Sequence, residues 1–232
     1  MEGKIGFVII HGFAGGLQEI EPLNCFLKDK GYLTACPVLD GHTGMRKDLK
    51  KTNYEEWIAS AEESLLELKK QCHKIFVVGF SMGGLIGVNL VLKHKVEGIA
   101  TLCAPIYYWD IKRVSLNIIE DFKKRQYKNL QKYFNATVRI PLKAMVNFRI
   151  LLAKTKPLIK EINCPIFVAQ GLIDDTVHHR SGKYIYDNSA SKMKKLKYYK
   201  NSDHIICCGA EREALFNDLY EFSKKVLNKG EN

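Results

Sequence analysis

The sequence predicts an α/β fold in which a mostly parallel sheet of six to seven strands carries helices on both faces. Short apolar runs alternate with helix-length segments along the 232 residues, and this alternation is typical of strands joined by crossover helices. Most of the runs are continuously apolar, as expected of parallel strands covered on both faces. A chain of this length can bury a substantial core. We therefore predict a single domain over residues 1–232.

Six segments are predicted to be strands, because most of them are short apolar runs bounded by turn residues. In chain order they are KIGFVII (4–10), YLTACPV (32–38), KIFVVGF (74–80), VEGIATLCA (96–104), CPIFVAQ (164–170) and KLKYYK (195–200).

Helices are predicted between and after these strands, at 18–30, 54–71, 82–94, 181–190 and 211–228. The clearest is YEEWIASAEESLLELKKQ (54–71), because Asn53 and Glu56 have the spacing of a capping box at its start. The segment 107–157 has no convincing strand and is instead rich in Lys, Arg, Phe and Tyr with a helical period. It is too long for a plain loop in a compact domain, so we predict a helical cap of two or three helices inserted there.

Chemistry is first indicated by Gly79-Phe80-Ser81-Met82-Gly83, which matches G-x-S-x-G. A predicted strand precedes the motif and a predicted helix follows it, as the motif requires. The two glycines allow a sharp turn that presents the serine oxygen at the carboxyl edge of the sheet. We therefore predict that Ser81 is a nucleophile rather than part of a structural turn.

A serine nucleophile needs a histidine base and an acid that orients it, each at the carboxyl end of a strand. Asp174 and Asp175 follow the fifth predicted strand, and His204 follows the sixth. The order Ser81, Asp174, His204 is that of the α/β-hydrolases. Asp175 remains the competitor of Asp174 for the role of the acid.

The other histidines fit catalysis less well. His178 and His179 follow the aspartates too closely and suit the solvated start of a helix, whereas His73 and His94 suit surface positions at helix ends. His42, in LDGHTG, is expected to stabilise a turn, with a place facing the site as the alternative.

The intermediate of acyl transfer also needs backbone donors for its oxyanion. We predict that these are the N–H groups of Met82, which follows the nucleophile, and of Phe13 in the loop HGFAGG (11–16). The same loop matches neither G-x-G-x-x-G nor the lysine-bearing phosphate loop, which argues against nucleotide binding.

Composition limits the partners. The formal net charge is +11, but the lysines are scattered and no RNA-reading or helix-turn-helix motif accompanies them, so a solvated basic surface is expected, with attraction of anionic substrates as the alternative. The seven cysteines lack metal-type spacing and predict buried, reduced thiols. No segment has the length of a membrane span or the features of a signal peptide, which favours a cytoplasmic protein without stable membrane insertion.

With HGFAGG, GFSMGG, GLIDDTV and SDH in register, the sequence resembles the small bacterial carboxylesterases that lie beside the monoacylglycerol lipases in the α/β-hydrolase fold. The resemblance runs over nearly the whole chain. It implies a serine esterase with Ser81, Asp174 and His204 as its triad, an acyl pocket under the cap, and no need for a cofactor or metal. One departure is Asp203, where such enzymes usually have glycine before the catalytic histidine. Its carboxylate would be placed to raise the basicity of the imidazole or to compete with Asp174.

The predicted function is hydrolysis of short- to medium-chain acyl esters through an acyl-enzyme intermediate. Phe13, Met82, Ile106 and Tyr107 are expected to line an apolar pocket for the small acyl ester, although some of these residues could be ordinary core. Monoacylglycerol lipase, thioesterase and peptidase activities use the same triad and stay open, as does a non-catalytic ligand-binding relative. The sequence does not indicate an oligomeric state.

Overall fold

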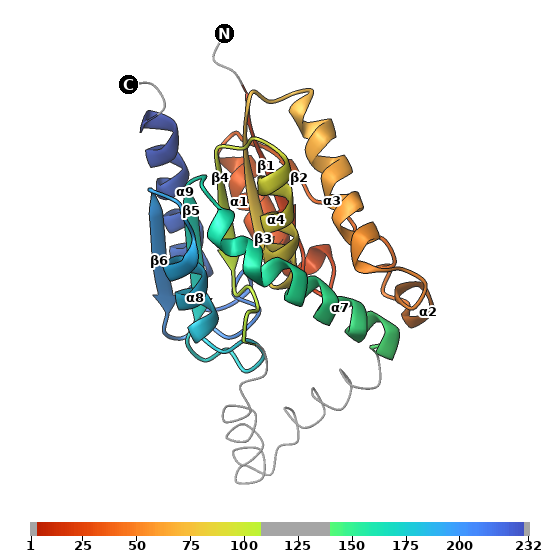
Figure 1. Cartoon of the computed structure of the whole chain (residues 1–232). Coiled ribbons are helices and arrows are strands. Elements are labelled where there is room, and N and C mark those ends of the chain that lie inside the picture. The colour runs from red at the N-terminus through yellow and green to blue at the C-terminus, as the bar shows by residue number, and fades with distance from the viewer. Residues whose placement is uncertain (1–3, 108–139, 230–232) are drawn as a thin grey trace.

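A computed structural model of the chain describes residues 4–107 and 140–229 (Figure 1). Its six strands form one sheet in the order β2-β1-β3-β4-β5-β6, and every neighbouring pair is parallel. The strands are β1 (Ile5–Ile10), β2 (Leu33–Ala35), β3 (Lys74–Phe80), β4 (Gly98–Leu102), β5 (Ile166–Gly171) and β6 (Lys194–Tyr199). The predicted fold class is thus confirmed. β2 is shorter than predicted because Pro37 follows it, and proline has no N–H to extend the ladder.

All five helices predicted outside the cap are present. The helices are α1 (Glu21–Asp29), α2 (Arg46–Leu49), α3 (Tyr54–Lys69), α4 (Met82–Lys93), α7 (Leu142–Thr155), α8 (Arg180–Asn188) and α9 (Arg212–Lys229), with short 3-10 helices η1 (Leu17–Glu19) and η2 (Lys156–Glu161). The predicted helix 18–30 is split into η1 and α1, and Pro22 lies in the first turn of α1, where its missing N–H costs nothing. The capping box at α3 is present, since Asn53 accepts from the backbone of Glu56 and the Glu56 side chain accepts from Asn53.

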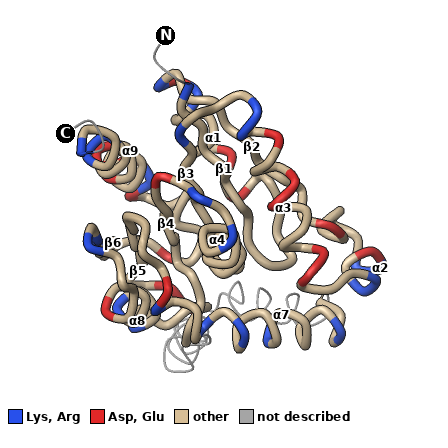
Figure 2. The backbone as a smooth tube through the Cα atoms, turned by 45° about the horizontal axis from the view of Figure 1, so that its top comes forward, with Lys and Arg blue, Asp and Glu red and all other residues tan. Residues whose placement is uncertain are grey.

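The helices cover both faces of the sheet, as Figure 2 shows. Alternate residues of β1 point to opposite faces. Phe7 and Ile9 pack with α1 and α9, whereas Val8 and Ile10 pack with α3 and α4. All four side chains are fully buried, so β1 is covered on both sides. This burial explains why its sequence is an unbroken apolar run.

Residues 108–139 of the predicted cap lie outside the described residues. The described end of that segment forms α7, which is anchored to the two helices beneath it. The side chain of Asn147 accepts a hydrogen bond from the Tyr54 backbone at the start of α3 (3.3 Å). Thr155 is 2.8 Å from the Asn89 amide of α4. α7 is therefore held against α3 near its middle and against α4 at its C-terminal end.

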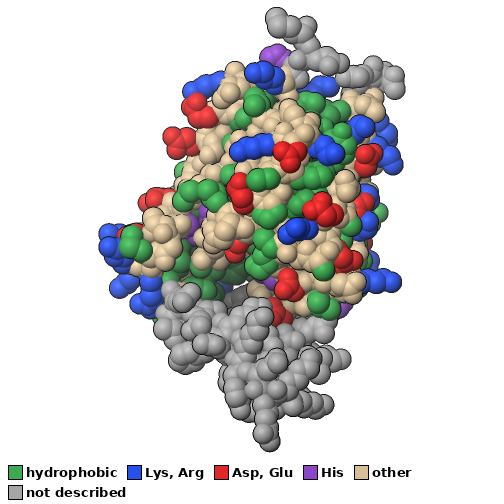
Figure 3. Space-filling model, turned by 180° about the vertical axis from the view of Figure 1, so that it is seen from behind, with side chains coloured by type: hydrophobic (Ala, Val, Ile, Leu, Met, Phe, Trp, Pro, Cys, Tyr) green, Lys and Arg blue, Asp and Glu red, His purple; other side chains and the backbone are tan. Residues whose placement is uncertain are grey.

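Charged side chains of both signs are spread over the surface. Figure 3 shows acidic and basic residues interspersed over the face seen from behind. Basic residues, coloured blue in Figure 2, lie on α2, where Arg46 and Lys47 are exposed. Among the described helices, none is both long enough and apolar enough to cross a membrane. All seven cysteines are free thiols, as predicted, but Cys25 and Cys208 are exposed rather than buried.

Candidate active site

Ser81 occupies the turn between β3 and α4, with a backbone φ of 52° and ψ of −121°. A positive φ is strained for a residue with a side chain. The turn is held by the Ser81 N–H, which donates to the Leu102 carbonyl oxygen (2.8 Å). A Cβ on Gly79 would lie 2.2 Å from the Gly83 oxygen, and one on Gly83 would lie 2.2 Å from the Ile10 oxygen. Only glycine at both positions lets the chain close this turn and present the serine oxygen.

His204 lies between Ser81 and Asp174, so residues that follow three different strands meet at the carboxyl edge of the sheet. The imidazole Nδ1 is 2.9 Å from Asp174 Oδ2, and its Nε2 is 3.0 Å from Ser81 Oγ. Nδ1 faces a carboxylate and therefore carries the proton, which leaves Nε2 free to accept from the serine hydroxyl. The spacing is that of a nucleophile, a base and an orienting acid.

The Asp174 carboxylate is fixed by several donors. Its Oδ1 accepts from the backbone N–H groups of Thr176 and Val177, both at 2.8 Å. Its Oδ2 accepts from Gln170 Nε2 at 3.3 Å in addition to His204. Asp175 is also buried, and its side chain accepts from the hydroxyl of Thr176 at 3.1 Å. The imidazole thus bonds to Asp174 and not to the competing aspartate.

Cys103 is a member of this cluster that the sequence did not reveal. It follows β4, is fully buried and has a φ of 50°. Its sulfur lies within 4.8 Å of ligand atoms of Asp174 and His204, the one such group of three among the described residues. Burial, and next the negative charge of Asp174, raise the pKa of the Cys103 thiol well above its ordinary value. A protonated thiol is a poor metal ligand but can donate to the carboxylate, so we assign it to the support of Asp174.

Strained backbone collects at this site. Among the described residues, the non-glycine residues with positive φ are Ala14, Ser81 and Cys103. They follow β1, β3 and β4, which are neighbours in the sheet. Strain of this kind costs roughly 1–3 kcal/mol per residue and is typical of functional sites. The three positions mark one continuous edge around the serine.

The two predicted oxyanion donors, Met82 and Phe13, follow the neighbouring strands β3 and β1. Met82 is the first residue of α4, where backbone N–H groups have no acceptor within the helix. Phe13 lies in the loop after β1, and its ring stacks on Phe148 of α7 (5.1 Å between ring centres, 18° between planes). The same ring also packs against Trp57 of α3 at 5.7 Å. The roles of Phe13 and Met82 as oxyanion donors remain predictions.

Ile106 and Tyr107, the predicted pocket residues, follow β4 in the chain. Their backbone N–H groups both donate to the Ser181 hydroxyl oxygen, at 3.3 and 2.9 Å. Ile106 is buried, whereas the Tyr107 side chain is exposed and has the cations of Lys156 and Arg180 against its ring. Tyr107 therefore lies at the surface, in a more basic setting than an apolar pocket wall.

Asp203 does not adopt the left-handed backbone that would suit glycine, because its φ is not positive. Its exposed carboxylate accepts from the Ile205 N–H at 3.1 Å. This bond stabilises the turn that carries His204, whose Nδ1 bonds to Asp174. The departure from glycine thus leaves the loop intact.

Of the remaining histidines, His179 precedes α8 and is exposed, and His73 is exposed. His94 is half-buried rather than a plain surface residue, and it pairs with Glu62 at 2.5 Å.

His42 supports the turn at residues 39–42, where its N–H donates to the Leu39 carbonyl oxygen (2.9 Å). Its Nδ1 bonds to the Asp40 carbonyl oxygen (3.2 Å), and its ring packs edge-on against those of His11 and Trp57. These contacts favour the predicted turn-stabilising role. Burial, and next the neighbouring His11, lower the pKa of His42 to about 4. Burial also lowers the pKa of His11, so both histidines are held in the neutral form.

The buried His42 predicts acid sensitivity. Its folded pKa of about 4 lies below its ordinary value of 6.5, so the unfolded chain binds the proton first, and stability is lost as pH falls from about 6.5 towards about 4. Between about pH 7.5 and about pH 5 we expect His42 to contribute a loss of about 2 kcal/mol. Urea unfolding at both pH values should show that His42→Asn loses less stability than the wild type by about this amount. Equal losses in the two proteins would contradict the expectation.

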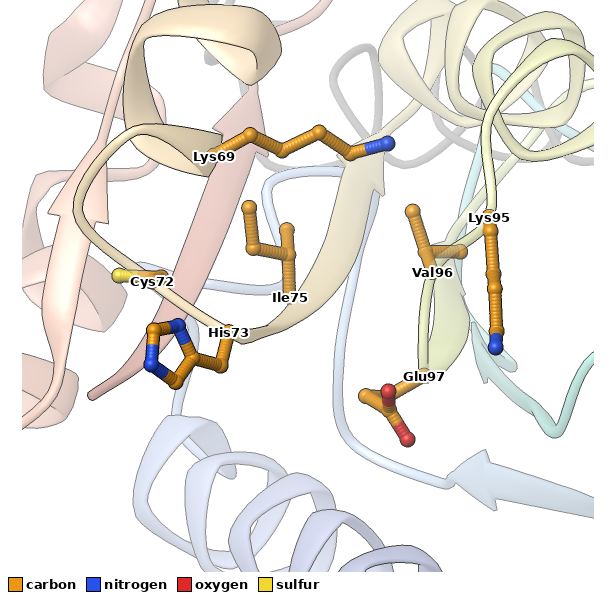
Figure 4. A pocket seen from close by; sticks show the side chains of 7 residues that line it. All are labelled: Lys69, Cys72, His73, Ile75, Lys95, Val96 and Glu97. Carbon is orange, nitrogen blue, oxygen red and sulfur yellow. The ribbon is translucent and has the colours of Figure 1, made fainter. Parts of the chain in front are cut away.

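A separate hollow of about 350 Å³ lies at the opposite edge of the sheet, where β3 and β4 begin (Figure 4). Lys69, His73, Lys95 and Glu97 are among its lining residues. Its position at the amino ends of the strands places it away from Ser81, which lies at the carboxyl end of β3. It contributes nothing to the cluster around the serine.

The chain is similar in sequence and in structure to known esterases and lipases. The chain is 27% identical over 234 residues to a carboxylesterase of Bacillus subtilis (strain 168), covering 97% of this chain and 94% of the relative. It is also 27% identical to a thermostable monoacylglycerol lipase of Bacillus sp. (strain H-257), covering 96% and 92%. A structure from work on LipS and LipT, two metagenome-derived lipolytic enzymes, superimposes with a TM-score of 0.81 at 21% identity, covering 96% of this chain and 95% of that one. The family model of the alpha/beta hydrolase fold matches residues 7–139, more than half of the sequence. The chain therefore belongs to the alpha/beta hydrolase fold family.

Proposed function

We propose that this protein is a serine carboxylesterase that uses Ser81 as nucleophile, His204 as general base and Asp174 as the orienting acid. That it is a carboxylic ester hydrolase follows from its family and its relatives. The observation that carries the mechanism is the pair of bonds through one imidazole, 3.0 Å to Ser81 Oγ and 2.9 Å to Asp174 Oδ2. The rings of His11 and His42 bond instead to backbone groups, and that of His94 bonds to Glu62.

In the first step the Ser81 oxygen attacks the acyl carbonyl while its proton passes to His204 Nε2. The carbonyl oxygen takes the negative charge and is stabilised by the N–H groups of Phe13 and Met82. The ester bond to the alcohol then breaks, and the alcohol leaves with the proton from His204. The products of this step are the free alcohol and an acyl group on Ser81.

In the second step water takes the place of the alcohol. His204 removes a proton from the water, whose oxygen attacks the acyl carbonyl, and the oxyanion forms again at the same donors. Collapse of the intermediate breaks the bond to Ser81, which recovers its proton from His204. Asp174 holds Nδ1 protonated throughout and stabilises the imidazolium.

The favoured substrates are short- to medium-chain acyl esters. Met82 follows the serine in the chain, and Ile106 follows the neighbouring strand β4. Both are buried apolar residues, and the ring of Phe13 adds a third apolar surface. Monoacylglycerols are the second candidate, because one relative is named as a monoacylglycerol lipase. Acyl thioesters remain the third, since the same triad can cleave them. We further propose that residues 107–157 form a cap on the single domain. The described part of this segment includes α7, which packs on Phe13 through Phe148.

A series of nitrophenyl esters tests the substrate class. We expect kcat/KM to be highest for short or medium acyl chains and to fall for long chains, because the apolar surface around Phe13 is limited by α7. Monoacylglycerols and acyl thioesters are measured beside them, with the Ser81→Ala variant subtracted as background. A preference for thioesters at every chain length would contradict the carboxylesterase proposal.

A further inference from the structure

The side chain of Glu19 lies inside the bend of the oxyanion loop. Glu19 is the last residue of η1, and its backbone N–H donates to the Gly16 carbonyl oxygen (3.1 Å). Its side chain turns back to the start of the loop, where Oε2 accepts from the Gly12 N–H at 3.1 Å. Glu19 thus joins the two ends of the segment that contains Phe13, with its backbone bonded to Gly16 and its side chain to Gly12.

The loop is shaped closely around this carboxylate. A Cβ on Gly15 would lie 2.1 Å from Glu19 Oε2, and one on Gly12 would lie 3.2 Å from the same atom. Between these glycines, Ala14 has a φ of 54°. Small residues and a strained turn therefore let the chain wrap around the carboxylate.

The position of this carboxylate also decides which N–H groups face the serine. The Gly12 N–H is used by Glu19 and cannot serve an oxyanion at the same time. The next N–H along the chain is that of Phe13, whose ring is fixed by Phe148 and Trp57. Glu19 thus holds the loop at Gly12, and these rings hold it at Phe13. The Phe13 peptide therefore has little freedom to rotate.

The charge environment of Glu19 includes the catalytic histidine. Three described titratable groups act on the Glu19 carboxylate. They are His204, which attracts its negative charge, and the thiols of Cys207 and Cys208, which lie on the same loop as His204. Burial raises the pKa of Cys207, and burial likewise raises that of Cys208, so both thiols are neutral near pH 7. Burial also raises the pKa of Glu19, while its bond to Gly12 and the charge of His204 oppose this effect. His204 is thus the charged partner of this carboxylate when the imidazole is protonated.

We propose that Glu19 is a positioning residue for the oxyanion hole: it folds loop 12–16 so that the Phe13 N–H points at the developing oxyanion. The inference rests on the proposed serine esterase mechanism and deepens it. Glu19 touches neither the substrate nor the reacting atoms. It acts through the backbone of Gly12 and Gly16.

Two substitutions at Glu19 test this role, with Glu63→Gln on the exposed face of α3 as the matched control. Glu19→Ala removes the side-chain bond to Gly12 and should lower kcat roughly 10- to 100-fold with little change in KM, because the loss of an oxyanion donor costs about 10²- to 10³-fold at most. Glu19→Gln keeps an acceptor for Gly12 and should restore kcat to within about threefold of wild type. Glu63→Gln should change neither kcat nor KM.

The measurements are kcat and KM on one nitrophenyl ester, with circular dichroism as the check of folding. Wild-type kcat in Glu19→Ala, or a kcat in Glu19→Gln as low as that of Glu19→Ala, would overturn the proposal. If Glu19→Ala does not fold, Glu19→Asp takes its place, because its shorter side chain cannot reach Gly12 from the same backbone. Labelling of wild-type Ser81 by a fluorophosphonate is measured separately. Failure of that labelling would count against the serine esterase mechanism itself, whatever the Glu19 variants do.

Discussion

Replacing Ser81 with alanine is expected to lower ester turnover on the order of 10⁴-fold or more while the protein stays folded. The variant loses the oxygen that lies 3.0 Å from His204 Nε2 and that we propose forms the acyl bond. It keeps a Cβ, so the strained backbone at φ 52° is no more strained than before. The Ser81 N–H bond to the Leu102 oxygen also remains. The loss should therefore appear in kcat rather than in folding.

The measurement is kcat on a medium-chain nitrophenyl ester, together with thermal unfolding and labelling by a fluorophosphonate. Ser64→Ala on α3 is the matched control and should behave as wild type in all three. We expect the fluorophosphonate not to label Ser81→Ala, and we expect this variant to unfold at the same temperature as the wild type. Retention of more than about a hundredth of the wild-type turnover would contradict the assignment of the nucleophile.

Asp174→Asn should cost on the order of 10³- to 10⁴-fold in kcat. The N–H groups of Thr176 and Val177 both donate to Oδ1, so the asparagine oxygen will take that place and its amide nitrogen will face His204. An N–H cannot accept from the protonated Nδ1, and the imidazole must move its proton to Nε2. In that tautomer Nε2 can no longer take the proton of Ser81. The fold should survive, because the substitution keeps the size of the side chain.

Asp175→Asn is the matched test, because the two aspartates are neighbours and both are buried. We expect it to keep kcat within about tenfold of wild type, since the imidazole bonds to Asp174. The two variants are compared for kcat and for the pH profile on the same ester. A larger loss in Asp175→Asn than in Asp174→Asn would transfer the role of the acid to Asp175.

The sequence was sufficient to predict the strands and the three side chains that meet at the carboxyl edge of the sheet, because both depend on local patterns. Strands covered on both faces appear as apolar runs, and Ser81 and Asp174 each follow such a run, whereas His204 follows the lysine-rich strand β6. Helix α2 was not predicted, because its four residues are too few to show a period. β2 was predicted too long, because its apolar run continues past Pro37 although the ladder does not.

The supporting residues of the site were not predictable in the same way. Cys103 reaches Asp174 only because β4 and β5 are neighbours in the sheet, and its sequence context contains no signal of that contact. Gln170 looked like the end of a strand, and its bond to Asp174 depends on the turn that follows. Glu19 falls within the helix predicted at 18–30, and its contact with Gly12 depends on how the loop folds around it. Such contacts are set by tertiary packing rather than by spacing along the chain.

Phe13 connects two parts of the protein. Its backbone is in the loop proposed to stabilise the oxyanion, while its ring stacks on Phe148 of α7 and lies against Trp57. An acyl chain that displaces α7 must also disturb this stack, and with it the peptide that we propose faces the reacting carbonyl. Discrimination between acyl groups would then be expressed in the rate of acylation and not only in how tightly each ester is held. A poorly fitting ester could occupy the site well and still react slowly.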